Sequence, residues 1–436
     1  MANSYLTFNE TTTPANQTKF TYSAWIKRSK LGSDQTIFYN YKDSNNYAYM
    51  YFRSADDIRY FDRVGGGDTA IFVTTRLFRD TSAWYHLVLQ VDTTQGTAGD
   101  RIKFYVNGVQ ETFASSTIPN QNQALSLPRE GTRTIGASNG GSNHFDGYQS
   151  HVAFVDSTSP AYTTFGSTDA TSGIWKFKPP SGVTWGNTGF HLKFENSGAL
   201  GTDSSGNSST FTVNGNLTQT VDTPSINWVT FNPLLNSGSG QVSYSRANTR
   251  GGTGGGLSYL TMMPTTGKWF MEFNINVAGA GQDNGIGFWS IDEAQRIAFY
   301  QSGFKGIVWK YAGNVYANGS NNAFSSNTFT SGDIISVAMD MDNSTATFYK
   351  NGSVATNLNA YSFPFTEREA ISVGIMDGAV ASAEDGIFDF NSGANPTFGG
   401  RKTAGGNADG NSQGNFSMAV PSGYYALNTK NLNTYG

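Results

Sequence analysis

The 436-residue sequence has no cysteine, which excludes disulfides, thiolate nucleophiles and cysteine-ligated zinc. Charged residues are also scarce: Lys, Arg, Asp and Glu make up 14% of the chain, against about 25% in typical soluble proteins. The formal net charge is −4, and the Lys and Arg residues are not clustered. Because tracking a phosphate backbone requires a positive surface, we expect no nucleic-acid partner.

Long hydrophobic runs are missing as well. No window approaches the ~18 consecutive apolar residues of a transmembrane helix, so we expect no membrane insertion. The segment from Met1 to Glu10 lacks the basic and apolar stretches of a secretory signal peptide. We therefore expect a chain that is made in the cytoplasm without a signal peptide.

Aromatic residues and glycine are abundant, with 31 Phe, 22 Tyr, 8 Trp and 51 Gly. A helical protein needs Ala, Leu, Glu and Lys in bulk, and a disordered chain has few aromatics. No window places apolar residues at helical spacing. The sequence therefore predicts an all-β protein whose aromatic and β-branched strands are separated by turns.

The strand and turn patterns divide the chain into four parts. The parts are a β-sandwich over 1–156, an ordered connector with short strands over 157–235, a second sandwich over 236–398, and a Gly/Asn-rich loop with a C-terminal docking segment over 399–436. The connector is rich in Ser, Thr, Gly and Pro, but it also contains Trp175, Trp185 and Trp228. Three tryptophans in such a segment indicate an ordered structure.

One strand–turn–strand unit occurs twice. Each copy ends in Phe-Tyr-x-Asn-Gly, with the Asn-Gly pair at 107–108 and at 351–352. Asn-Gly between two strands predicts a type I′ hairpin turn. In the preceding strand of each copy, alternate residues are apolar and are expected to face a core. These residues are Tyr85, Leu87, Leu89 and Val91 in the first copy and Ile335, Val337, Met339 and Met341 in the second.

These segments resemble two known families. Trp84-Tyr-His-Leu-Val-Leu-Gln-Val-Asp92, followed by Ile102-Lys-Phe-Tyr-Val-Asn-Gly108, resembles the central signature of laminin-G/concanavalin-like lectin domains. The segment 332–352 is similar to the core of SPRY domains, and Gly267–Phe273 and Gly386–Asn391 fit their first and last strands. Both families are concanavalin-like jelly rolls. The resemblance implies two concanavalin-like β-sandwich (jelly-roll) domains joined by an ordered, β-containing connector.

A further resemblance concerns the connector and the C-terminus. Segments 198–207, 222–233 and 424–432 look like segments of structural proteins of marine bacteriophages, in which the same lectin–connector–SPRY order recurs. The resemblance implies a virion structural protein at the particle surface, as a capsid appendage or a tail fibre component. Its implied partners are other virion proteins, copies of itself and host cell-surface glycans.

Catalytic patterns are few. None of the four histidines pairs at i, i+4 as in a zinc-binding helix. Asp340 and Asp342, on one strand face, come nearest to the two carboxylates that a glycosidase requires. Because they lead into a turn, we expect no catalysis there. Calcium could be bound by Asp34, Asp43 or Asp203, but nothing in the sequence selects one of them, and we expect no metal and no cofactor.

Two groups of aromatic residues could face a ligand. Tyr39, Tyr41, Tyr47, Tyr49 and Tyr51 alternate on either side of the turn at 43–46 and predict a hairpin with one tyrosine-covered face. Near predicted loops, the candidate ligand-binding residues are Trp289, Tyr300, Trp309 and Tyr316. Aromatic faces stack on sugars, pack in cores and anchor protein interfaces, so all three roles stay open for both groups.

The sequence therefore favours a non-enzymatic virion surface protein that adheres to host glycans and makes assembly contacts. One alternative is a purely architectural virion protein without a glycan site. The other is a glycan-degrading enzyme on a jelly-roll scaffold.

Overall fold

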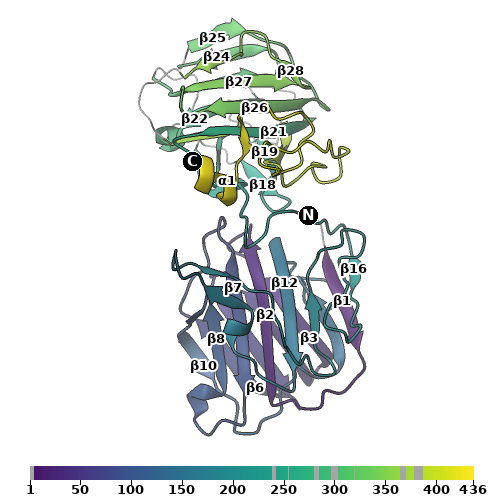
Figure 1. The fold of residues 1–436 in the computed structure, drawn as a ribbon. Coiled ribbons are helices and arrows are strands. Elements are labelled where there is room, and N and C mark those ends of the chain that lie inside the picture. The colour runs from purple at the N-terminus through teal and green to yellow at the C-terminus, as the bar shows by residue number, and fades with distance from the viewer. Residues whose placement is uncertain are drawn as a thin grey trace. The chain divides into compact units, whose positions relative to one another are not determined.

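The computed structural model describes residues 4–237, 242–253, 255–278, 284–295, 303–318, 320–363, 370–377 and 386–436. The chain divides into two compact units, Met1–Gln219 and Thr220–Gly436, here called the N-terminal and C-terminal units (Figure 1). Both are built almost entirely of antiparallel strands, which confirms the all-β prediction. No helix in the described ranges is long and apolar enough to cross a membrane.

The N-terminal unit is a sandwich of two sheets. The first sheet runs, in spatial order, β10 (Phe113–Thr117), β6 (Gly67–Thr74), β5 (Ile58–Val64), β4 (Asn46–Phe52), β3 (Gln35–Asp43), β11 (Gly131–Ile135), β1 (Tyr5–Glu10) and β16 (Thr212–Asn214). The second runs β15 (Phe190–Leu192), β12 (Gly147–Asp156), β2 (Lys19–Arg28), β7 (Tyr85–Asp92), β8 (Ile102–Val106) and β9 (Val109–Gln110). Short 3₁₀ turns lie at Ala98–Asp100 and Tyr162–Thr164.

Alternation along the strands supplies the core of this sandwich. In β2, Phe20, Tyr22, Ala24 and Ile26 point between the sheets, as the period of two requires. Tyr85, Leu87, Leu89 and Val91 of β7 join them, as predicted. The other face of β2 is also buried. On the same outer face of the sheet, the hairpin of β13 (Gly166–Thr168) and β14 (Trp175–Phe177) places Trp175 on His86 of β7, with ring centroids 5.9 Å apart.

The C-terminal unit is a second sandwich. One sheet runs β17 (Phe231–Ser237), β20 (Gly256–Leu260), β30 (Ile371–Asp377), β22 (Asn284–Ser290), β23 (Gly306–Lys310), β24 (Asn314–Ala317) and β25 (Ser320–Ser325). The other runs β18 (Ser243–Ser245), β19 (Arg250–Thr253), β31 (Gly386–Asn391), β21 (Lys268–Val277), β26 (Ile334–Asp340), β27 (Thr345–Lys350) and β28 (Ser353–Val354), with β29 (Tyr361–Ser362) on β27 and β32 (Tyr425–Ala426) on β21. A 3₁₀ turn spans Ile291–Gln295.

The predicted core strand of this unit is confirmed, since Ile335, Val337, Met339 and Met341 pack between the sheets. The last residues of the chain cover the outer face of β21 and β26, where Phe416 packs edge-on against Phe270 with ring centroids 5.1 Å apart. The carboxylate of Glu272 accepts hydrogen bonds from the backbone N–H groups of Ser417 (3.0 Å) and Met418 (2.8 Å), which holds this segment on the sheet.

The two units share one strand order. The series β6-β5-β4-β3-β11-β1 corresponds to β25-β24-β23-β22-β30-β20, and β12-β2-β7-β8-β9 corresponds to β31-β21-β26-β27-β28. Both Asn-Gly turns have two positive φ angles, 49° and 77° at Asn107-Gly108 and 49° and 83° at Asn351-Gly352, as a type I′ turn requires. Each Asn side chain also accepts a backbone N–H from the preceding strand, at 2.7 Å from His86 and 2.8 Å from Ile334.

Two details differ from the sequence-based expectation. The boundary at 219/220 lies inside the predicted connector: β13 to β16 belong to the N-terminal unit, whereas Trp228 and β17 belong to the C-terminal unit. A short helix, α1 (Thr429–Tyr435), also stands where no helical spacing was found. It begins at the capping residue Asn428, whose side chain accepts the N–H of Asn431 at 2.9 Å.

Candidate functional site

The hairpin of β3 and β4 forms the most conspicuous surface of the N-terminal unit. Its register places Tyr39 opposite Tyr49 and Tyr41 opposite Tyr47. At the turn, Asp43 accepts the backbone N–H of Asn45 at 2.8 Å, a local bond that favours a tight reversal. The predicted hairpin is therefore confirmed, with its tyrosines on the face opposite the core.

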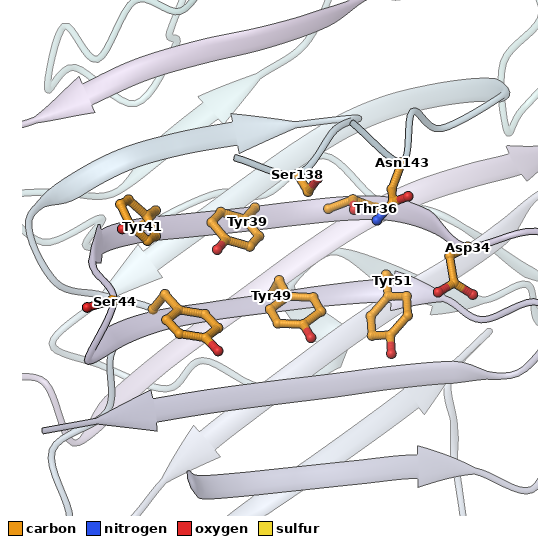
Figure 2. A pocket seen from close by; sticks show the side chains of 10 residues that line it. Asp34, Thr36, Tyr39, Tyr41, Ser44, Tyr49, Tyr51, Ser138 and Asn143 are labelled. Carbon is orange, nitrogen blue, oxygen red and sulfur yellow. The ribbon is translucent and has the colours of Figure 1, made fainter. Parts of the chain in front are cut away.

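The five tyrosines lie in two adjacent rows, and we call them the tyrosine plate: Tyr39 and Tyr41 on β3, and Tyr47, Tyr49 and Tyr51 on β4. Figure 2 shows Tyr39 and Tyr41 beside Tyr49 and Tyr51. Along β4 the ring centroids follow at 6.2 and 5.1 Å. Across the strands, Tyr39 lies 5.4 Å from Tyr49 and Tyr41 lies 6.3 Å from Tyr47. The rings thus form one continuous aromatic surface.

The tyrosine plate lines a hollow of about 460 Å³. Its remaining lining residues are small and polar: Asp34, Thr36, Ser44, Ser138 and Asn143. Hollows of roughly 300–1,000 Å³ hold small-molecule ligands in many proteins. The floor continues onto β5, where the buried ring of Phe61 lies 5.4 Å from that of Tyr49.

Burial favours the protonated, uncharged form of two tyrosines of the plate. Burial, followed by the neighbouring tyrosines, raises the pKa of Tyr39 above its ordinary value, so its hydroxyl stays protonated. Burial likewise raises the pKa of Tyr49. The lining carboxylate, Asp34, lies at one end of the plate and accepts the backbone N–H of Ser54 at 2.7 Å.

Two arginines of β5 flank the plate. The guanidinium of Arg59 lies 5.5 Å from the centroid of Phe61. Arg63 lies 5.6 Å from the ring of Tyr47 and donates two hydrogen bonds to Asp68, at 2.6 and 2.8 Å. The charge of Arg63 is therefore balanced by a carboxylate outside the plate.

The candidate residues near the predicted loops are placed differently from the plate. Trp289 and Trp309 have 0% exposure and Tyr316 has 6%. Trp309 lies between the sheets, whereas Trp289 and Tyr316 lie under a second apolar layer on the outer face of the β22–β23 sheet. No face of these rings is open for stacking on a sugar. Tyr300 lies outside the described residues.

A serine–histidine contact also occurs in the N-terminal unit. Ser23 Oγ and His86 Nε2 are 2.9 Å apart, but both residues are buried. The Nε1–H of Trp175 donates to His86 Nδ1 at 2.9 Å, so in the neutral ring the proton is on Nε2 and points at the serine. A ring in this tautomer cannot take the serine proton, and desolvation lowers the His86 pKa to about 3.

The two predicted strand-face carboxylates have structural partners. Asp340 pairs with Lys268 at 2.8 Å and accepts two hydrogen bonds from Asn343. Asp342 accepts the backbone N–H of Gly267 at 2.9 Å. Within the described ranges, no three His, Cys, Asp or Glu side chains gather as a metal site would require.

Comparison with known families identifies the domain that carries the plate. Residues 1–161 match the family model of the concanavalin A-like lectin/glucanases superfamily, laminin G type. These residues form a laminin G/concanavalin A-like lectin domain. The lectin resemblance seen in the sequence is thereby confirmed, and the tyrosine plate lies inside this domain. No curated protein matches the chain.

Solved structures to which the chain is similar include three from animals. The SPRY domain of human HERC1 is 19% identical, covers 37% of this chain and 96% of its own, and has a TM-score of 0.30. The heptameric SAP-like pentraxin of Limulus polyphemus is 18% identical, with coverages of 37% and 72% and a TM-score of 0.28. Domains LG4-5 of the mouse laminin alpha1 chain are 11% identical, with coverages of 89% and 86% and a TM-score of 0.30.

The sequence therefore located the hairpin and its tyrosine-covered face, but it did not prefer that face over the group of Trp289, Tyr300, Trp309 and Tyr316 as a candidate ligand-binding surface. The available signal was the spacing itself, with five tyrosines at a period of two around one turn. The spacing does not show whether other parts of the chain cover the outer face of a sheet.

Proposed function

We propose that this protein is a non-enzymatic glycan-binding protein and that the tyrosine plate is its binding face. The observation that carries the proposal is a continuous surface of five uncharged aromatic rings within a lectin-like domain. Sugar rings present C–H faces that stack on aromatic rings, and their hydroxyls find partners in tyrosine hydroxyls and in short polar side chains. Ser138 and Asn143 supply such groups beside the plate.

The absence of catalysis is part of this proposal. Glycoside hydrolysis ordinarily needs two carboxylates, roughly 5–10 Å apart, on either side of the scissile bond. The lining of the hollow contains one carboxylate, Asp34, and it is committed to a backbone N–H. Incubation of the full chain with bound polysaccharides should therefore release no reducing ends. Release that is lost in Asp34→Asn or Asp340→Asn would contradict the proposal and favour the enzyme alternative.

The test of glycan binding uses the full chain on a glycan array, followed by titration calorimetry with the best ligand. Tyr49→Ala removes the central ring of the plate and should weaken binding about fivefold, because a lost ring contact costs about 1 kcal/mol. Tyr49→Phe keeps the ring and should bind more tightly than Tyr49→Ala.

Tyr162→Ala is the matched control. Tyr162 also belongs to a stacked pair, but it lies in the 3₁₀ turn Tyr162–Thr164 and stacks at 4.2 Å on Tyr105 of β8, in the second sheet. The Tyr162→Ala variant should bind glycan like the wild type. Folding of each variant is checked by its near-UV circular dichroism. If the folded wild type binds no glycan, or if Tyr49→Ala binds as the wild type does, the proposal is wrong.

We also propose that the protein resides on a virion surface and contacts other virion proteins and copies of itself. This wider proposal is supported by the resemblance of the connector and C-terminal segments to phage structural proteins. A reconstruction of purified particles tests it, with the plate expected to face outward. A plate covered by a neighbouring subunit would favour the purely architectural alternative.

A further inference from the structure

The length of the plate bears on what kind of glycan fits it. Tyr47, Tyr49 and Tyr51 occupy alternate positions of β4, so the row runs about 13 Å along the strand. Tyr39 and Tyr41 run beside it. A sugar ring and a phenol ring are both six-membered, so one sugar covers one tyrosine at a time. The row therefore offers consecutive stacking positions for several linked sugars.

The hollow is lined by a short side chain at each end of the tyrosine rows. Ser44 borders it at the turn and Asp34 at the opposite end, and both are short, exposed side chains (Figure 2). The remaining polar lining residues Ser138 and Asn143 lie beside the row of Tyr39 and Tyr41 (Figure 2). At both ends of the rows, the residue that lines the hollow is thus a short side chain, as a linear chain extending beyond the rows would require. This geometry suits the interior of a polymer.

The charges near the plate oppose one another. Arg59 and Asp34 act on Tyr49 in opposite directions: the arginine lowers the tyrosine pKa and the aspartate raises it. At the other end, Arg63 is paired with Asp68. The residues that line the hollow include no lysine or arginine. An acidic sugar placed on the rings thus meets no cation in the hollow and one carboxylate at its end.

We propose that the tyrosine plate binds the interior of an uncharged, linear polysaccharide, with several consecutive sugars stacked along β4. This inference rests on the proposed glycan-binding function and specifies its ligand class. It predicts that affinity grows with chain length, that free chain ends are not needed, and that salt has little effect on binding.

The probes are soluble mixed-linkage glucan, xylan, mannan and dextran as neutral chains, and alginate as an acidic chain. For each neutral polymer that binds the full chain, oligosaccharides from monosaccharide to hexasaccharide are titrated. Affinity should rise at least tenfold from the monosaccharide to the tetrasaccharide. Oligosaccharides blocked at both ends should bind as well as free ones, and binding should persist from low salt to about 0.5 M NaCl.

Two variants at opposite ends of the row separate the positions. Tyr47→Ala and Tyr51→Ala should each weaken binding of the hexasaccharide several-fold and flatten the dependence on length. Arg59→Ala, which changes a flanking charge and leaves the five tyrosines in place, should bind the neutral chains as the wild type does.

The outcomes distinguish the two proposals. If a monosaccharide competes as well as the polymer, if end-blocking abolishes binding, or if alginate binds best and Arg59→Ala abolishes that binding, this inference is wrong while glycan binding stands. If none of the probes and no array glycan binds, the proposed function itself fails.

Discussion

Acid should destabilise the N-terminal unit through its buried histidines. All four histidines of the chain, at positions 86, 144, 151 and 191, lie in this unit. Three of them stack on aromatic rings of the connector: His86 on Trp175 (5.9 Å), His151 on Phe177 (3.8 Å) and His191 on Trp185 (5.3 Å). The connector is thus attached to the second sheet partly through neutral imidazoles.

Burial holds these rings neutral. Desolvation lowers the pKa of His86 from its ordinary 6.5 to about 3 and the pKa of His191 to about 4. The pKa of each histidine is lower in the folded chain than in the unfolded chain, so the unfolded chain takes up protons first as the pH falls. The contribution of each neutral histidine to the free energy of unfolding is therefore complete above pH 6.5 and is lost as the pH falls toward the pKa of the folded chain. At pH 5, each of these two histidines should remove about 2 kcal/mol from the free energy of unfolding.

One buried acid works in the opposite direction. Desolvation raises the pKa of Asp62 from 3.8 to about 6. The protonated carboxyl group therefore contributes fully to the free energy of unfolding below pH 3.8, and this contribution is lost as the pH rises through 6. Protonation of Asp62 should therefore add about 1 kcal/mol to the free energy of unfolding at pH 5 relative to neutral pH. The net loss from His86, His191 and Asp62 is therefore about 3 kcal/mol, a large share of the ~5–15 kcal/mol that stabilises a typical domain.

The assay is amide hydrogen exchange of the full chain at pH 7.5 and pH 5, corrected for the intrinsic exchange rates. Protection of β2, β7 and β14 should fall at pH 5. His86→Gln removes one titrating group and should make the pH dependence shallower. His144→Gln, the same change in a loop, should alter it less. Unchanged protection at pH 5, or an equal pH dependence in wild type and His86→Gln, would refute the reasoning.

Two further predictions concern single positions. Gly108→Ala should destabilise the N-terminal unit by more than 2 kcal/mol, because φ is +77° and a Cβ would lie 2.4 Å from the Trp175 ring, whereas Gly65→Ala, at φ +59° with open space, should lose only about 1 kcal/mol in thermal unfolding. In the C-terminal unit, burial raises the pKa of Glu272 from 4.5 to about 7, so the wild-type free energy of unfolding should fall by about 3 kcal/mol from pH 4.5 to above 7. Glu272→Gln should abolish that dependence in urea titrations, and an identical slope in the variant would contradict this assignment.

Local patterns predicted much of the fold. The Asn-Gly turns and the alternation of β7 and β26 were read from adjacent residues, because turn type and strand face depend on short-range geometry. The unit boundary was not predictable in this way. The connector contains short strands throughout, and its division at 219/220 depends on which distant strand each segment pairs with, as β16 does with β1.

Local patterns were likewise unable to separate buried aromatic residues from exposed ones. Trp289 alternates with core residues in β22 as Tyr39 does in β3, so the period of two places both on outer faces. The period cannot tell whether that face is later covered. Leu257, Tyr259 and Phe304, brought from other parts of the chain, help to bury Trp289.

The corresponding strands β3 and β22 show why one outer face stays open and the other closes. In β22, Gly287 pairs with Gly374, and a Cβ on Gly374 would lie 2.7 Å from the Trp289 ring. Glycine thus lets the indole lie against the sheet, where an apolar layer can cover it. In β3 and β4 the positions opposite one another are both tyrosine, so the rings crowd together and form a surface of their own. Two sandwiches with one strand order therefore differ in this outer face: an apolar layer covers it in the C-terminal unit, and paired tyrosines form it in the N-terminal unit.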